Sequence, residues 1–214
     1  MTGPRLELWM ARGKTGRSFD MSSVPTRHCT AAEYLAFERE AEARHEFVDG
    51  QIVEMSGGSV RHATICDNLL ICVQARLRDT GCRDFSASLR VKIEATGNYT
   101  YPDLSVLCGE ARLEDDRQDT LLNPRLIVEV LSPSTERHDR VWKFRNYQLI
   151  SSFEEYVLVS QDEPRVERFL RQGDIGWLMT QVVGLDQTVR FESITCELPL
   201  IEIYEQAAFS RIHE

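Results

Sequence analysis

The sequence has little of several features that would narrow its function at once. None of its apolar runs approaches the roughly 18 residues that span a bilayer, so we expect no membrane partner. The start of the chain also lacks the charged-then-apolar order of a secretory signal. The chain has few basic residues relative to acidic ones, with 25 Lys and Arg and 34 Asp and Glu, which give a formal net charge of −9. Since basic surface supplies most non-specific affinity for nucleic acids, contact with a polyanion must be local or assisted by a metal ion.

Common catalytic motifs are missing as well. The chain has no G-x-x-x-x-G-K-[ST] phosphate loop, no G-x-G-x-x-G after a strand and no G-x-S-x-G elbow. C-x-x-C pairs are absent, which argues against a zinc knuckle or a disulfide framework. We therefore predict free thiols in a reducing compartment, and a cytoplasmic location. The six cysteines are Cys29, Cys66, Cys72, Cys82, Cys108 and Cys196.

What remains is an ordinary globular composition, with 42% hydrophobic and 28% charged residues over 214 positions. Residues 1–20 show neither helical nor strand periodicity and are predicted to be a mobile extension, with Met21 as an alternative natural start. Residues 21–214 are predicted to form a single domain.

Helical and strand patterns alternate along this domain. Thr30-Ala-Ala-Glu33 is a capping box, and Asp49-Gly50 between two apolar segments predicts a hairpin. The order predicts an α/β fold in which a mixed central sheet is flanked by helices. The predicted helices cover 60–77 and from the caps Ser134 and Thr135 to about 150; the predicted strands cover 85–93, 101–107, 126–131, 156–159, 166–170 and 177–183.

Glu129 is the most informative position, because it lies in the middle of the apolar run Leu126–Leu131. Such a run is typical of a strand buried on both faces, where an ionised carboxylate needs a cation or hydrogen-bond donors. A metal-ligand role is one reading, and the other is a core carboxylate that is paired with an arginine or capped by backbone groups.

Asp103 follows Pro102 at the head of the next candidate strand. If that strand lies beside the strand of Glu129, two carboxylates converge at one end of the sheet. Oxygen donors of this kind suit Mg²⁺ or Mn²⁺. Taken alone, Asp103 could equally be a turn acid after proline.

Four further residues are candidates for the same site, each with an ordinary alternative. Lys143 lies on the helix after the Glu129 strand and could reach back to orient water, or it could be a solvated lysine. Tyr147 is one turn further on the same helix face, where it could pack or donate a hydrogen bond. Glu46 could supply a third carboxylate or be a surface residue. His62 falls on the apolar face of its helix, where a core histidine is the commoner case.

These residues belong to a longer pattern that resembles the Uma2 (DUF820) family of the PD-(D/E)XK nuclease superfamily. The resemblance covers about residues 28–206, and its fragments stand in the same order. They are Thr30-Ala-Ala-Glu-Tyr-Leu, His45-Glu-Phe-Val-Asp-Gly-Gln-Ile-Val-Glu-Met, His62, Tyr101-Pro-Asp-Leu, Glu129-Val-Leu-Ser-Pro-Ser-Thr, Asp139-x-x-x-Lys143-x-x-x-Tyr147 and Glu155-Tyr156.

The resemblance implies a restriction-endonuclease-like core, with Asp103 and Glu129 as metal ligands and Glu46 as a further acid. One departure is visible, because the superfamily places a lysine two residues after the acid, where this chain has Leu131. Lys143, 14 residues after Glu129, is the expected replacement.

The leading hypothesis is therefore a Mg²⁺- or Mn²⁺-dependent endodeoxyribonuclease that acts on DNA as a homodimer. Asp103, Glu129 and the Val130 carbonyl would bind the ion, Glu46 and Lys143 would complete the catalytic set, and His62 and Tyr147 would support it. The alternatives are a catalytically silent module of the same fold, acting as a regulator or interaction partner, and a metal hydrolase acting on a small phosphorylated substrate.

Overall fold

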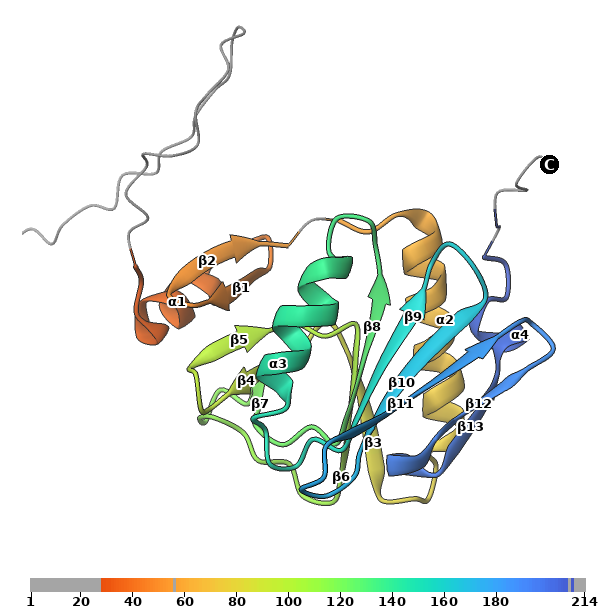
Figure 1. Cartoon of the computed structure of the whole chain (residues 1–214). Coiled ribbons are helices and arrows are strands. Elements are labelled where there is room, and N and C mark those ends of the chain that lie inside the picture. The colour runs from red at the N-terminus through yellow and green to blue at the C-terminus, as the bar shows by residue number, and fades with distance from the viewer. Residues whose placement is uncertain (1–27, 56, 208, 210–214) are drawn as a thin grey trace, which may run out of the picture.

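The structure is a computed structural model that describes residues 28–55, 57–207 and 209 (Figure 1). The predicted extension over 1–20 and the alternative start at Met21 lie outside these residues. Within the described part of the chain, no helix is long and apolar enough to cross a membrane.

A six-stranded sheet forms the centre of the molecule, in the order β11-β10-β9-β8-β6-β3. β8 and β9 are parallel and the other neighbours are antiparallel, so the sheet is mixed, as predicted. Every residue of β8 and β9 is buried, which explains why β8 appears in the sequence as an unbroken apolar run around one acid. The strands are β3 (Cys82–Ser86), β6 (Leu104–Cys108), β8 (Leu126–Leu131), β9 (Glu155–Ser160), β10 (Arg165–Arg171) and β11 (Trp177–Val183).

One face of this sheet is covered by the long helix α2 (Val60–Arg76), which lies behind the strands in Figure 1. Its apolar stripe Ile65, Leu69 and Val73 packs against Val128 and Val130 of β8. Alternate residues of a strand point to opposite faces, so Glu129 must point away from α2. The same core includes β12 (Thr188–Phe191), η2 (Glu192–Ile194), β13 (Cys196–Pro199) and α4 (Leu200–Ile203).

The opposite face is covered by the helical segment that follows β8, which lies in front of the sheet in Figure 1. This segment consists of the π-helical turn η1 (His138–Lys143) and α3 (Phe144–Tyr147). Tyr147 packs here with Tyr156 and Phe153, in the cluster that also contains Ile127 and Leu131 of β8. Glu129 therefore points toward η1 and α3, beside this aromatic cluster.

A second sheet, in the order β2-β1-β5-β4-β7, stands beside the first. The predicted capping box is confirmed, because Thr30 caps α1 and the Glu33 carboxylate accepts from the Thr30 N–H at 2.8 Å. The predicted hairpin is confirmed too, and Asp49 and Gly50 take positive φ in its turn. The elements are α1 (Ala31–Glu38), β1 (His45–Val48), β2 (Gln51–Glu54), β4 (Arg90–Ile93), β5 (Asn98–Thr100) and β7 (Thr120–Leu121).

One predicted strand is wrong as a single element, and another begins later than predicted. The segment 85–93 turns at Ser86, whose carbonyl accepts from the Leu89 N–H at 3.2 Å, and its halves β3 and β4 belong to different sheets. The alternation of apolar residues continued through the turn and hid it. The segment 101–107 begins as a strand only at Leu104, because Pro102 has no N–H for a ladder.

Two other expectations need correction. The helix after β8 is preceded by Ser132, whose Oγ accepts from the Thr135 N–H at 3.3 Å, so neither Ser134 nor Thr135 is the cap. The prediction that all cysteines are free thiols is also wrong, because Cys82 and Cys108 form a disulfide. These two residues face each other in the β3–β6 register, a proximity that their separation of 26 positions does not reveal.

Candidate active site

The strands β6 and β8 bring Asp103 and Glu129 together, as expected if the two strands were neighbours. Leu104 pairs with Val128, so the residue before β6 lies beside the end of β8. Asp103 Oδ2 accepts from the Val130 N–H at 2.7 Å, and the Asp103 N–H lies 3.4 Å from Glu129 Oε2. Two carboxylates thus converge where β8 ends.

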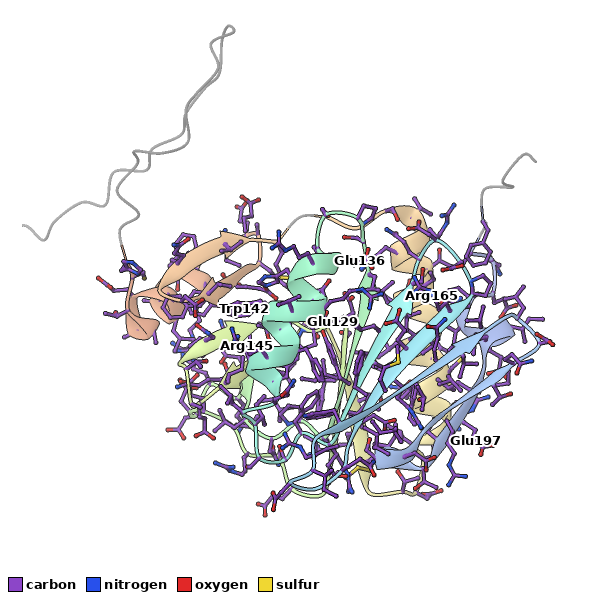
Figure 2. All side chains as sticks on the ribbon, in the orientation of Figure 1. Glu129, Glu136, Trp142, Arg145, Arg165 and Glu197 are labelled. Carbon is purple, nitrogen blue, oxygen red and sulfur yellow. A yellow bond between two sulfur atoms is a disulfide. The ribbon has the colours of Figure 1, made fainter. Side chains whose placement is uncertain are left out.

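Glu129, labelled in Figure 2 beside the helical segment of η1 and α3, is only 2% exposed. Side chains of that segment hold its carboxylate. Its Oε1 lies 3.0 Å from Lys143 Nζ and 2.9 Å from the Tyr147 hydroxyl. That hydroxyl is also 3.0 Å from Thr100 Oγ1. The partner is therefore a lysine on the next helix and not an arginine, which rules out the ordinary arginine-paired reading.

Lys143 forms ion pairs with three acids, and these residues together with Asp103 make up the carboxylate cluster. Its ammonium lies 3.0 Å from Glu129, 3.1 Å from Asp139 Oδ1 and 3.3 Å from Glu46 Oε1. The side chain is buried, so the alternative of a solvated helix lysine is wrong. The π-helical turn that carries Lys143 is a rare backbone form that is frequently found at functional sites.

Glu46 reaches the cluster from the second sheet. It lies in β1, is buried, and its Oε1 accepts from the Tyr101 N–H at 3.3 Å. His138 Nε2 lies 3.5 Å from its other oxygen, Oε2. The surface alternative for Glu46 is therefore wrong, and both sheets contribute an acid to one site.

Sequence reasoning missed Asp139, His138 and Cys66 as neighbours of the site. Asp139 precedes Lys143 by one helical turn, which is the signal that could have found it. His62 was a candidate to support the site, with a core histidine as the commoner alternative; its Nε2 lies 3.5 Å from Asp103 Oδ2 and its side chain keeps 17% exposure. Cys66 follows on α2, with Sγ 3.5 Å from His62 Nδ1.

The electrostatics of the cluster indicate a shortage of positive charge. Burial raises the pKa of Glu129 well above its ordinary value, and the neighbouring Asp139, Asp103 and Glu46 raise it further against the effect of Lys143. For Glu46, burial is outweighed by Lys143 and by a hydrogen bond from His138, which lower the pKa to about 2. The hydrogen bond to Asp103 raises the pKa of His62.

The donor set fits a hard divalent cation. Three carboxylates, those of Glu46, Glu129 and Asp139, surround a single lysine, and Asp103 lies beside Glu129. Among the residues that the structure describes, Glu129 Oε2 has only the 3.4 Å contact to the Asp103 N–H, while Asp103 accepts from the Val130 N–H through its Oδ2. These oxygens are ligands of the type that Mg²⁺ and Mn²⁺ prefer. The Val130 carbonyl as a further ligand stays a prediction.

This arrangement of a mixed sheet, flanking helices and acids at the end of a central strand defines a restriction-endonuclease-like α/β fold. The chain is similar in structure to a crystal structure described as "a putative nuclease belonging to DUF820" from Anabaena variabilis ATCC 29413. The TM-score is 0.68 at 18% identity, over 84% of this chain and 99% of that one.

The chain belongs to the Uma2 family, described as "Putative restriction endonuclease", whose model matches residues 31–200. Two relatives from Synechocystis sp. PCC 6803 are each 35% identical to it. The uncharacterized protein sll1609 matches 80% of this chain and 97% of its own length, and the uncharacterized protein slr1290 matches 87% and 97%.

Proposed function

We propose that the protein is a Mg²⁺- or Mn²⁺-dependent endodeoxyribonuclease that hydrolyses phosphodiester bonds of DNA. The observation that carries this proposal is the convergence of Asp103, Glu129 and Lys143 at the end of β8. Membership in a family described as restriction endonucleases supports it. A homodimer that places one site on each DNA strand, and a cytoplasmic location, belong to the same proposal.

Asp103 and Glu129 would hold the ion, with the Val130 carbonyl as a third donor. A divalent ion bound there supplies Lewis-acid activation of water and offsets charge on the phosphate oxygens. The Val130 N–H fixes one oxygen of Asp103, and Tyr147 fixes one oxygen of Glu129, so the opposite oxygens are the ones that would bind the ion.

Lys143 would orient the attacking water and stabilise charge that develops on the phosphate. Glu46 and Asp139 hold the ammonium in position and keep it protonated. His138 adds positive charge on the far side of Glu46 when it is protonated. The net charge of −9 means that affinity for DNA must come from this local region and from the ion.

The test is cleavage of supercoiled plasmid at low salt with Mg²⁺, Mn²⁺ or chelator, with metal binding followed by calorimetry in the same preparations. Glu129→Gln is expected to lose both cleavage and metal binding, and Lys143→Met to lose cleavage. Glu155→Gln is the matched control. Glu155 is also a fully buried strand glutamate, but it accepts from the Ser193 N–H at 2.8 Å and lies at the opposite end of the sheet.

Cleavage that Glu129→Gln leaves intact would refute the assignment of the site. Metal binding without cleavage of DNA would point to a small phosphorylated substrate. A wild-type protein that neither binds metal nor cuts would make the fold a non-catalytic regulatory or interaction module.

A further inference from the structure

A second group of metal-ligating side chains lies on the α2 side of Asp103. One ligand atom each from His62, Cys66 and Asp103 can be chosen so that all three lie within 4.8 Å of one another. His62 and Cys66 are one turn apart on α2, and Asp103 stands at the head of β6. None of the three is fully buried, so the group is open to ions from solvent.

The spacing of these atoms is close to that of a tetrahedral site. Zn–N bonds of about 2.0 Å and Zn–S bonds of about 2.3 Å place neighbouring ligand atoms roughly 3.3–3.8 Å apart. Cys66 Sγ lies 3.5 Å from His62 Nδ1, and His62 Nε2 lies 3.5 Å from Asp103 Oδ2. Since an ion takes one ring nitrogen, only one of these two contacts can serve as it stands, and the remaining ligand atoms lie within 4.8 Å of one another.

The backbone around His62 is shaped to hold the ring there. A Cβ built on Gly58 would stand 2.8 Å from His62 Nδ1 and 3.1 Å from Cγ, closer than side chains approach. Gly58 therefore permits the ring to sit against the chain that leads into α2. The Ser59 hydroxyl accepts from the His62 N–H at 3.1 Å and fixes the first turn of the helix.

The chemistry of this group differs from that of the carboxylate cluster. Sulfur and imidazole nitrogen are ligands that Zn²⁺ binds well and that Mg²⁺ avoids. Glu129 and Lys143 contribute nothing to it, and Asp103 is the one residue common to both groups. The ordinary reading is a metal-free hydrogen-bond chain in which the Cys66 thiol donates to His62 Nδ1 and the His62 Nε2–H donates to Asp103, and a metal titration distinguishes the two.

We propose that His62, Cys66 and Asp103 form a Zn²⁺ site with three protein ligands and an open fourth position. Because Asp103 is shared, Zn²⁺ at this site would compete with the proposed Mg²⁺ ion for that carboxylate. Zinc binding itself does not rest on the proposed nuclease function, since its ligands and its spectroscopic signature are independent of DNA cleavage.

The test is a titration of the reduced protein with Co²⁺, which replaces zinc and reports its ligands by absorption. Wild type is expected to bind one Co²⁺ with a thiolate-to-cobalt charge-transfer band and the intense visible bands of four-coordinate cobalt. Excess Zn²⁺ should remove these bands, whereas Mg²⁺ at the same concentration should not.

Substitutions of the proposed ligands test where the cobalt ion binds. Cys66→Ser and Cys66→Ala are expected to lose the charge-transfer band, and His62→Ala to weaken cobalt binding by at least about tenfold. Cys72→Ser is the matched control and should keep the bands, because Cys72 lies on the same helix beside Arg76 and Glu202. Circular dichroism of each variant checks that it is folded.

A charge-transfer band that is absent from folded wild type, or one that persists in both Cys66 variants, would overturn the proposal. Glu129→Gln separates the two proposals, because it should keep the cobalt bands while it loses cleavage. Cobalt bands in a protein that cuts no DNA would support the zinc site and refute the nuclease, whereas cleavage without the bands would do the reverse.

Discussion

Replacement of Lys143 by methionine tests whether the carboxylate cluster is short of positive charge. The change keeps most of the side-chain volume and removes the ammonium that lies within 3.3 Å of Glu46, Glu129 and Asp139. Since all three acids are buried, the variant leaves like charges facing one another in a region of low dielectric constant.

The expected cost follows from that burial. Removal of one partner of a buried ion pair destabilises a protein by about 3–5 kcal/mol, which for a chain of this size lowers the melting temperature by roughly 6–20 °C. Part of this loss should return with Mg²⁺, because a divalent ion supplies the missing charge. At a concentration of 100 times its dissociation constant, a ligand adds about 2.7 kcal/mol.

Urea unfolding with and without Mg²⁺ measures both effects. Lys143→Met is expected to gain more from Mg²⁺ than wild type does, because its site is more negative. Lys92→Met is the control, since the Lys92 ammonium also pairs with a carboxylate, at 2.6 Å from Glu114, but outside the cluster and with both side chains partly exposed. Its loss should be at most about 1 kcal/mol, with no Mg²⁺ rescue.

The reasoning is refuted if Lys143→Met unfolds within about 1 kcal/mol of wild type, or if Mg²⁺ stabilises both proteins equally. A double variant with Glu129→Gln adds an internal check. Removal of one acid along with the ammonium should recover about 0.5–3 kcal/mol relative to the sum of the single changes.

Three further predictions concern stability. Tyr147→Phe removes a hydroxyl donor from buried Glu129 and should lower the free energy of unfolding by about 1–3 kcal/mol in urea; a loss below about 0.5 kcal/mol would contradict the contact. Hydrogen bonds from Arg39 and Arg90 outweigh burial and lower the pKa of Asp119. The ion pairs of Asp119 therefore contribute roughly 1 kcal/mol to the free energy of unfolding above pH about 4, and this contribution is lost as the pH falls through the folded pKa. The stability difference between wild type and Asp119→Asn, measured from pH 7 to 2, should therefore shrink with acidification, and a constant difference would refute the pairing. Reduction of the disulfide between β3 and β6, which joins positions 26 apart, should cost about 3 kcal/mol; an unchanged urea midpoint under reductant would contradict it.

The elements that sequence could predict are those whose pattern is set by burial on a single face or on both faces. The run Leu126–Leu131 and the helix α2 are of this kind, and both are confirmed. The segment 85–93 failed because its apolar alternation crosses a turn at Ser86 without a glycine or proline to mark it. Periodicity shows which residues are buried, and it does not show in which sheet they are buried.

In the candidate site, too, some features could be predicted from the sequence and others could not. The sequence placed Asp103 beside Glu129 only on the condition that their strands are neighbours, and the pairing of β6 with β8 meets that condition. The π-helical turn and the inward position of Asp139 depend on tertiary packing that no local pattern encodes. The Cys82–Cys108 pair is set by the β3–β6 register, which becomes visible only when the strands are aligned.

The position of the lysine shows how one arrangement of charges can be reached by another route. Leu131 lies two residues after Glu129 and on the same face of β8, but it is 5% exposed and packs in the aromatic core with Tyr147 and Tyr156. A lysine there would bury its ammonium among apolar side chains, at the cost of desolvation. The helix after β8 folds back over that core instead and delivers the ammonium of Lys143 to within 3.0 Å of the same glutamate. The requirement is thus a cation beside the acid, and the chain satisfies it with a helix when the strand position is needed for packing.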